Sequence, residues 1–383
     1  METRVVIVDW NHQLHSLFHS PHRLSARVVV DDEIIEKDTT IHNGAIKNLY
    51  RWSGKGSFPT AVCLDRPVAA RKAYFQEKFP EMKIGSGKEY KGNREKMPEA
   101  MFDASQDCEN ILKMAGVSVY AYPNYEADDL IFACIKRAKE KYPGCPIDVI
   151  TNDADLLPLV DDTVSVFLRS KKGTYAETKA LEKNHYIQVT PKNFEQVVSG
   201  LSAYKGFYIP YNTILLHKLL RGDTSDQFKC KDIARMFPAS KYNALVVEML
   251  GAGVDLESIF RYTEPKYTLV YKDTHEEFQG TIQEALASPD RDRIVKRVDN
   301  SENLDMILEL LHKYTPMTDE QIDRVGYLYV GMNLNQPYSG AMPQLKRPAI
   351  KIGKGKIPDI ERYDEVELQK AVSVFQIRLP MNS

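Results

Sequence analysis

The sequence predicts an α/β fold with a doubly wound, largely parallel sheet over about the first 205 residues, followed by a mainly helical region. Short apolar runs of strand length alternate with segments whose apolar residues recur at helical spacing, which is typical of a parallel sheet covered by helices. Acidic residues follow several of these runs. Since the carboxyl ends of parallel strands open onto one crevice, the acids are expected to share one edge of the sheet.

The elements of the first part follow from their apolar patterns in chain order. Strands are predicted at residues 4–9, 60–65, 117–121, 146–151 and 163–168. Helices are predicted at 41–52, 98–114 and 126–142, with a helical turn at 154–160. The helix at 126–142 has the clearest pattern, because its apolar residues Leu130, Ile131, Cys134, Ile135 and Ala138 fall on one face.

The second part of the chain has a different character. Helical patterns dominate it, at residues 210–220, 230–236, 241–250 and 303–314. From Gln336 the chain is rich in Pro, Gly and basic residues, which predicts a flexible tail that ends in the apolar segment 372–379. We therefore expect a core over 1–205, a helical region over 206–335 and a basic flexible tail over 336–383.

Composition narrows the classes of protein that the chain can represent. Five cysteines without a Cys-x-x-Cys pair disfavour a disulfide framework or a thiolate zinc site and predict a reducing compartment. No apolar run approaches the length of a membrane span, so we expect a soluble, cytoplasmic protein without a membrane partner. The net charge of −2 does not exclude nucleic acid, because bound divalent cations would make the total positive.

Nine carboxylates stand in five short motifs that follow strands or open helices: Asp9, Asp65, Glu126, Asp128, Asp129, Asp153, Asp155, Asp223 and Asp226. Asp153 and Asp155 are two residues apart, so extended backbone would point both to one face. Glu126 and Asp129 are three apart at a helix start and share a face. Gathered carboxylates repel one another, and hard divalent ions with oxygen ligands relieve that repulsion.

Each motif taken alone also has a plain structural explanation. A single Asp after a strand is usually a helix cap or a turn residue. The acids at 126–129 could simply favour the start of a helix. The joint pattern at one edge of one sheet instead favours a site for two divalent ions, of the kind that supports displacement at phosphorus.

Four histidines near the front of the chain, His12, His15, His19 and His22, also invite interpretation as metal ligands. Their spacing after the first strand is irregular. We therefore expect them on a loop or on the surface of a helix.

A basic segment completes the motif set. Residues 66–96 carry nine Lys or Arg and four Glu, and include Tyr90-Lys91-Gly92-Asn93-Arg94. The motifs in order are Asp9, Asp65, 90–94, 126–129, 152–156 and 222–226. Their order and spacing resemble the 5′-nuclease superfamily, which includes flap endonucleases, the 5′-nuclease domain of bacterial DNA polymerase I, and stand-alone bacteriophage 5′→3′ exonucleases and ribonuclease H enzymes. The resemblance covers about residues 4–230 and is nearest to the phage enzymes.

The resemblance implies a PIN-like core, a helical arch or clamp over residues 66–97, and a helix-three-turn-helix-like element in the helical region. It also implies two Mg²⁺ or Mn²⁺ ions. Asp9, Asp65, Glu126 and Asp128 would hold the first ion. Asp129, Asp153, Asp155, Asp223 and Asp226 would surround the second.

The resemblance further implies substrate contacts. Lys91 and Arg94 would lie in the arch and stabilise the charge that develops on the scissile phosphate, while Tyr90 would stack on a terminal base. The family usually carries a glycine turn, Ile-Pro-Gly-Val, where this chain reads 227–233 without glycine. Lys229, Lys231 and Arg235 would then contact phosphates as point charges, or belong to an ordinary helix surface.

The predicted function is metal-dependent 5′→3′ exonuclease or flap endonuclease action on flapped, nicked or RNA-primed duplex DNA. We expect a monomer, in the host cytoplasm if the chain is phage-encoded. Because 376–380 is similar to a clamp-binding peptide, the tail could recruit a sliding clamp or a single-strand-binding protein. Two alternatives stay open: a catalytically silent replication factor that binds DNA structures, and a PIN-type ribonuclease on single-stranded RNA.

Overall fold

The computed structural model describes most of the chain between residues 3 and 379. The described residues are 3–20, 22–30, 33–67, 69–81, 91, 97–123, 125–169, 182–183, 186–223, 226, 230–262, 266–271, 273–274, 276–280, 282–299, 301–332, 359–373, 375, 377 and 379.

The chain divides into two compact units. Unit 1 contains Met1–Pro67, Glu95–Ala203 and Ile350–Ser383, and unit 2 contains Val68–Arg94 and Tyr204–Ala349. One division falls between Ala203 and Tyr204, next to the boundary expected at 205. Most of the predicted arch belongs to unit 2 rather than to the core, and the C-terminal segment belongs to unit 1 rather than standing apart as a tail.

A seven-stranded sheet forms the centre of unit 1, in the order β5-β4-β1-β6-β7-β9-β8. Its strands are β1 (Val5–Asp9), β4 (Thr60–Cys63), β5 (Ser118–Tyr120), β6 (Ile147–Thr151), β7 (Val164–Arg169), β8 (Glu182–Lys183) and β9 (Tyr186–Val189). The neighbours from β5 to β7 are all parallel, and β9 runs antiparallel to β7 and β8. The prediction of a largely parallel α/β sheet is therefore confirmed.

The strand order creates a switch point beside β1. The chain first places β4 and β5 on one side of β1, and then returns to place β6 and β7 on the other side. The connections that lead to β4 and to β6 therefore run to opposite sides of β1. Ligands of open α/β sheets bind outside the carboxyl ends of the strands at such a point, which here lies between Asp9 and Thr151.

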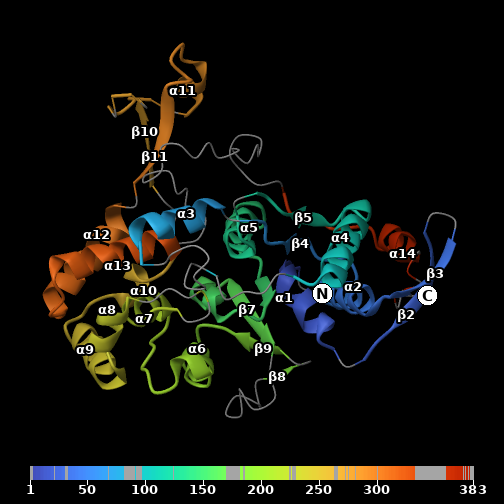
Figure 1. Ribbon diagram of the computed structural model, residues 1–383, viewed down its shortest axis with the longest axis horizontal. Helices are drawn as coiled ribbons and strands as arrows, with labels where there is room; N and C mark the ends of the chain where they lie inside the picture. The colour runs from blue at the N-terminus through green and yellow to red at the C-terminus, as the bar shows by residue number, and fades with distance from the viewer. Residues whose placement is uncertain are drawn as a thin grey trace. The chain divides into compact units, whose positions relative to one another are not determined.

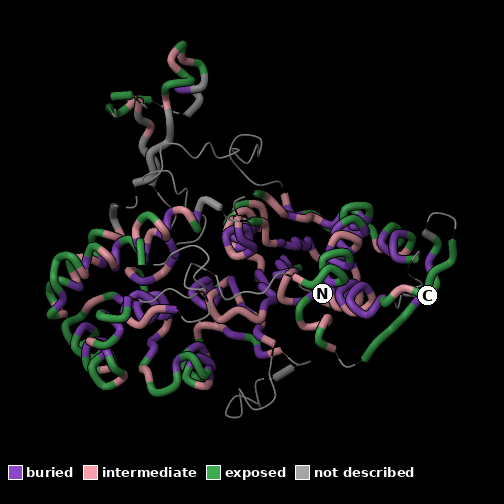
Figure 2. Tube along the Cα trace, in the orientation of Figure 1, coloured by how far each residue is buried: buried purple, intermediate pink, exposed green. Residues whose placement is uncertain are grey.

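Helices cover both faces of the sheet. The helix α5 (Ala127–Lys141) contacts β1, β4 and β6. Side chains of the opposite face, such as Val6 and Val62, join α1 (Trp10–Phe18), α2 (Thr40–Trp52) and α4 (Glu99–Met114) in one hydrophobic core. Figure 2 shows the strands at the centre of unit 1 as buried. Unit 1 also contains a turn of 3₁₀ helix, η1 (Ala154–Leu159), α6 (Phe194–Ser199) and a hairpin of β2 (Ser25–Val30) and β3 (Glu33–Asp38).

The C-terminal segment corrects the predicted flexible tail. Its helix α14 (Glu365–Ser373) packs on α4, where the two lie side by side in Figure 1. Leu368 and Val372 are fully buried in the core of unit 1. Ile377 and Leu379, the apolar residues of the segment compared with a clamp-binding peptide, are buried there too. The described residues between 359 and 379 therefore pack on the core of unit 1, and the basic residues between 346 and 356 lie outside the described residues.

Unit 2 is mainly helical, as predicted. Its helices are α3 (Ala69–Lys78), α7 (Ile214–Arg221), α8 (Lys231–Met236), α9 (Ala239–Gly251), α10 (Leu256–Ile259), α11 (Ile282–Ala287), α12 (Ser301–Tyr314) and α13 (Asp319–Met332). The sequence prediction missed an antiparallel pair, β10 (Lys266–Tyr271) and β11 (Ile294–Asp299). Part of the predicted arch is the helix α3, which packs on α13. Within the described parts of both units, no helix is both long enough and apolar enough to cross a bilayer.

Candidate active site

Asp9 ends β1 and caps the helix that follows. Its Oδ1 accepts the backbone N–H of His12 at 3.5 Å, and its Oδ2 accepts the hydroxyl of Thr151 at 2.8 Å. The side chain is 1% exposed. Burial raises the pKa of Asp9, and the nearby carboxylates of Asp65 and Asp153 raise it further, whereas His12 and the Thr151 hydroxyl lower it. Asp9 is thus a buried acid whose charged form needs a cation.

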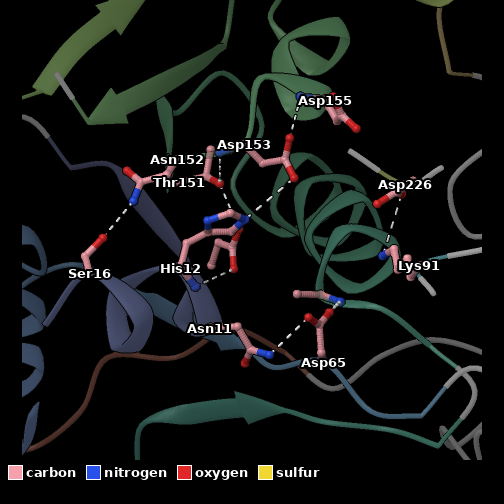
Figure 3. Close-up of polar contacts among 12 residues, drawn as sticks. Asn11, His12, Ser16, Asp65, Lys91, Thr151, Asn152, Asp153, Asp155 and Asp226 are labelled. Atoms are coloured by element: carbon pink, nitrogen blue, oxygen red, sulfur yellow. Dashed lines mark hydrogen bonds and ion pairs between the residues drawn. The ribbon is translucent and has the colours of Figure 1, made fainter. Parts of the chain in front are cut away.

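Asp65 follows β4 and ties three elements together. Its Oδ1 accepts the backbone N–H of Ala127 at 2.7 Å, at the start of α5. Its Oδ2 accepts the side-chain amide of Asn11 at 3.0 Å, from the first turn of α1 (Figure 3). Both oxygens therefore already hold a protein donor, which fixes the carboxylate at the edge of the sheet.

Asp153 lies just past β6 and is 25% exposed. Its Oδ1 accepts the backbone N–H of Asp155 at 2.9 Å, which makes it the cap of η1. The assumption of extended backbone between these two acids is therefore wrong, because the chain turns into a 3₁₀ helix at Ala154. Asp153 remains at the sheet edge, while Asp155 stands within the helical turn.

The acids at the start of α5 have different roles: Asp129 caps the helix, whereas Asp128 acts on His12 near the sheet edge. Asp129 is buried, and its Oδ2 accepts the backbone N–H of Glu126 at 3.0 Å, the arrangement of a capping box. Asp128 is half-buried, and its charge acts on both His12 and Cys63. One oxygen of Asp129 is thus committed to the helix N-terminus, and Asp128 is the acid of this motif whose charge reaches His12.

His12 is a residue that sequence reasoning considered as a metal ligand and then set aside. It lies on the surface of α1, as expected, but that surface faces the acids. Its Nε2 is 3.6 Å from Oδ2 of Asp9 and 3.6 Å from Oδ2 of Asp153 (Figure 3). The charge of Asp9 raises the pKa of His12 to about 10 despite partial burial, with smaller contributions from Asp153 and Asp128. Its position three residues after a helix-capping Asp was the available signal, because N-cap and N3 side chains lie close together.

The two remaining acids belong to unit 2, where each faces a lysine. Lys218 Nζ donates to Oδ2 of Asp223 at 2.6 Å, and both side chains are buried. The backbone N–H of Asp226 donates to Oδ1 of Asp223 at 3.3 Å. Lys91 Nζ is 3.8 Å from Oδ2 of Asp226. Sequence reasoning named both acids but missed Lys218, whose five-residue separation from Asp223 fits no helical pairing rule.

The predicted substrate-binding residues are only partly described. Lys91 adopts a φ of 56° and donates its backbone N–H to the carbonyl oxygen of Asp226 at 3.0 Å. Lys231 and Arg235 are exposed on α8 and line a cavity of about 630 Å³ together with Arg221 and Phe207. Three further predicted contacts lie outside the described residues: Tyr90, Arg94 and Lys229.

The donor set of unit 1 fits a divalent ion by its chemistry. Asp9, Asp65 and Asp153 come from the carboxyl ends of three adjacent strands, and the charges of Asp65 and Asp153 raise the pKa of Asp9. Among the side chains that the structure describes, no three acids, histidines or cysteines already surround a single point. Loading an ion would therefore require the carboxylates to draw together.

Comparison with known proteins supports the family resemblance. Residues 4–185 match the sequence family described as "5′-3′ exonuclease, N-terminal resolvase-like domain". The 5′-3′ exonuclease of Halalkalibacterium halodurans is 34% identical over 110 residues, which cover 28% of this chain and 35% of that protein. DNA polymerase I of Lactococcus lactis is 30% identical over 109 residues, which cover 28% of this chain and 12% of that protein. The chain thus matches about a third, or less, of these relatives' length.

Among solved structures, the bacteriophage T5 flap endonuclease in complex with DNA and metal ions aligns with a TM-score of 0.47 at 14% identity. The alignment covers 97% of this chain and 99% of that chain. The residues matched in sequence, 4–185, include the strands β1, β4 and β6, at whose carboxyl ends Asp9, Asp65 and Asp153 lie. Residues 4–185 therefore belong to the family of 5′-3′ exonuclease N-terminal, resolvase-like domains.

Proposed function

We propose that this protein is a divalent-metal-dependent 5′-nuclease that hydrolyses phosphodiester bonds in flapped, nicked or RNA-primed duplex DNA. The observation that carries the proposal is the position of Asp9 and Asp153 on either side of the switch point in a family domain of 5′-3′ exonucleases. Asp65 and Asp153 lie close enough to Asp9 for their charges to act on it, and His12 brings only one positive charge to this group, which favours a cation-dependent role.

We assign the acids of unit 1 to metal binding, with a PIN-like core as their scaffold. Asp9, Asp65, Glu126 and Asp128 would hold a first ion, and Asp129, Asp153 and Asp155 would support a second, directly or through water. When bound, such ions lower the pKa of a water molecule and stabilise charge on the phosphate and on the leaving oxygen.

The protein's own residues keep this constellation in place. Thr151 and the N-terminus of α1 orient Asp9. Asn11 and Ala127 orient Asp65. Because these donors come from strands and helix starts, Asp9 and Asp65 are held at the sheet edge, where a bound ion would draw the carboxylates together before substrate arrives.

Unit 2 supplies the candidates for nucleic-acid contacts. Lys231 and Arg235 are exposed cations that border a cavity, as expected for residues that meet phosphate groups, and the helix pair α7–α8 would be the helix-three-turn-helix-like element. Lys91 lies beside Asp226 and would exchange this partner for the scissile phosphate. Asp223 has a structural partner in Lys218.

The test is a cleavage assay with purified protein on three labelled substrates: 5′-flap DNA, an RNA–DNA hybrid and single-stranded RNA. Each is incubated with Mg²⁺ and with chelator. We expect cleavage of the flap and the hybrid with Mg²⁺ and none with chelator. The near-isosteric variant Asp9→Asn should lower the single-turnover rate by at least about a hundredfold.

The same assay separates the rival functions. Tight flap binding without any metal-dependent cleavage would identify a silent DNA-structure-binding factor. Cleavage confined to single-stranded RNA would identify a PIN-type ribonuclease. Either result would contradict the proposed 5′-nuclease.

A further inference from the structure

We propose that the imidazole of His12 is a nitrogen ligand of an ion held between Asp9 and Asp153, and that it biases this position towards transition-metal ions over Mg²⁺. The inference rests on the proposed function, since it requires that divalent ions bind at the carboxyl ends of β1 and β6. It adds a nitrogen to a site whose other candidate ligands are all carboxylates.

The distances around His12 are close to those of ligands that share an ion. Its Nε2 is 3.6 Å from one oxygen of Asp9 and 3.6 Å from one oxygen of Asp153. Two ligand atoms that each bind an ion at about 2.1 Å lie about 3.0 Å apart in an octahedral site and about 3.4 Å apart in a tetrahedral one. The nitrogen is therefore within a few tenths of an ångström of a ligand position for both acids.

The backbone of His12 is fixed while its ring remains accessible. Asp9 accepts the His12 backbone N–H, so the residue sits in the first turn of α1. The neighbouring Trp10 and Leu14 are fully buried in the core of unit 1, and they prevent α1 from rotating. The His12 side chain is 39% exposed, which leaves an incoming ion a path to its ring.

A nitrogen ligand changes which ion the site prefers. Carboxylates and water suit Mg²⁺, whereas imidazole favours transition-metal ions, whose affinities rise along the Irving–Williams order. A position made only of acids would discriminate weakly between Mg²⁺ and Mn²⁺. With His12 in the shell, Mn²⁺ should gain affinity relative to Mg²⁺.

The experiment uses the full chain without DNA and two direct readouts. Isothermal titration calorimetry measures Mn²⁺ and Mg²⁺ affinity, and pulsed EPR of bound Mn²⁺ detects coupling to an imidazole ¹⁴N. The variants are His12→Ala and His12→Asn, with His19→Asn as the matched control. His19 is an exposed histidine at the C-terminal end of the same helix, away from the acids.

The expected result is a ¹⁴N coupling in the wild type and in His19→Asn that both His12 variants lack. Mn²⁺ affinity should fall about tenfold in the His12 variants, with a change of less than about threefold for Mg²⁺. The wild-type spectrum alone tests the proposal even if a variant does not fold.

Two outcomes would overturn the proposal in different ways. Stoichiometric Mn²⁺ binding without nitrogen coupling, or an equal rise in affinity for both ions in His12→Ala, would show that His12 only balances the acids' charge. That outcome leaves the proposed nuclease intact. Absence of any divalent-ion binding would overturn both the ligand role and the proposed function.

Discussion

Asp9 concentrates the electrostatics of the site in one buried side chain. Its carboxylate accepts the backbone N–H of His12 and the hydroxyl of Thr151, and it lies 3.6 Å from the imidazole of His12. Burial raises the pKa of Asp9. The acids around it, Asp65 and Asp153, add repulsion. Removal of one carboxylate from this group should therefore have two effects: it reduces the repulsion among the acids, and it removes a candidate metal ligand.

Asp153→Ala should therefore abolish turnover but retain binding of flap DNA. The substitution removes one candidate ligand and leaves fewer negative charges near a phosphate backbone. Single-turnover cleavage and equilibrium binding on the same 5′-flap DNA measure the two effects. Asp162→Ala, at an exposed acid of unit 1 that follows η1, is the control and should change neither. Loss of binding in Asp153→Ala would contradict the metal-ligand role.

Lys91→Ala should slow the chemical step more than it weakens binding. A cation that meets the scissile phosphate stabilises the charge of the transition state, and its loss should reduce the single-turnover rate by about tenfold or more. The dissociation constant for flap DNA should change by less than about threefold. Lys313→Ala, at an exposed lysine of α12, is the control. An unchanged single-turnover rate would refute the phosphate contact.

His217 carries a pH dependence inside unit 2. It is buried among the rings of Tyr204, Phe207 and Tyr242, and neither ring nitrogen has a hydrogen-bond partner among the described residues. Burial lowers the pKa of His217 from 6.5 to about 4. The unfolded chain therefore binds a proton at His217 more tightly than the folded chain does. Stability is fully present above about pH 6.5 and is lost as pH falls towards 4, by up to about 3 kcal/mol.

His217→Phe should remove that pH dependence. A phenyl ring fills the same space, cannot take up a proton, and leaves no unpaired nitrogen in the core. Urea unfolding between pH 4 and pH 7 is the measurement. The wild type should lose stability on acidification more steeply than the variant. Parallel curves would show that His217 stays neutral in the unfolded chain or is solvated in the folded one.

At the residue scale, the sequence predicted the acids but not their partners. Asp9, Asp65 and Asp153 follow apolar runs, so their place at the sheet edge could be predicted from strand periodicity alone. Asn11, His12 and Thr151 meet them only because α1 begins directly at Asp9 and β6 pairs with β1. Neither fact follows from periodicity. The capping role of Asp129 was one of the two explanations that the sequence left open.

At the element scale, α14 shows how composition can mislead. The Pro, Gly and Lys content before it is typical of a tail, yet Leu368, Ala371 and Val372 have the spacing of a helix face and are buried on unit 1. The backbone N–H of Thr60, which opens β4, also donates to the carbonyl oxygen of Glu361. The C-terminal segment therefore supports the strand that leads to Asp65.

Leu368→Ala should destabilise the full chain by about 2–4 kcal/mol, since it opens a cavity in the core. Val366→Ala, two residues away and 48% exposed, should cost less than about 0.5 kcal/mol. The free energy of unfolding in urea is the measurement. Equal effects of the two substitutions would mean that α14 does not pack on α4 in solution.

The elements missed by sequence reasoning have two different physical causes. In the hairpin β2–β3, the strand β3 is almost entirely exposed and includes Ile34, so it lacks the alternating burial that marks a strand, although Ala26 and Val28 of β2 are buried. The pair β10–β11 is separated by more than twenty residues, which hides its pairing from any local signal. Long, strongly periodic helices such as α4 and α5 were predicted within one or two residues of their bounds.

At the scale of the whole molecule, unit 2 is inserted into unit 1 in two places. Unit 1 contains both the N-terminal strand and the C-terminal helix α14, and the family match ends at residue 185. The core of unit 1 should therefore need the C-terminal segment even though the matched region does not reach it. Sequence similarity could locate the sheet that carries the acids, but a non-local contact such as α14 on α4 required the structure.

The most direct test of the central claim is anomalous diffraction from crystals of the full chain soaked in Mn²⁺. We expect an anomalous peak at the carboxyl ends of β1 and β6, within about 2.2 Å of oxygens from Asp9 and Asp153. A nitrogen of His12 should lie at a similar distance. Peaks only elsewhere on the molecule, with Asp9 and Asp153 still apart, would contradict it.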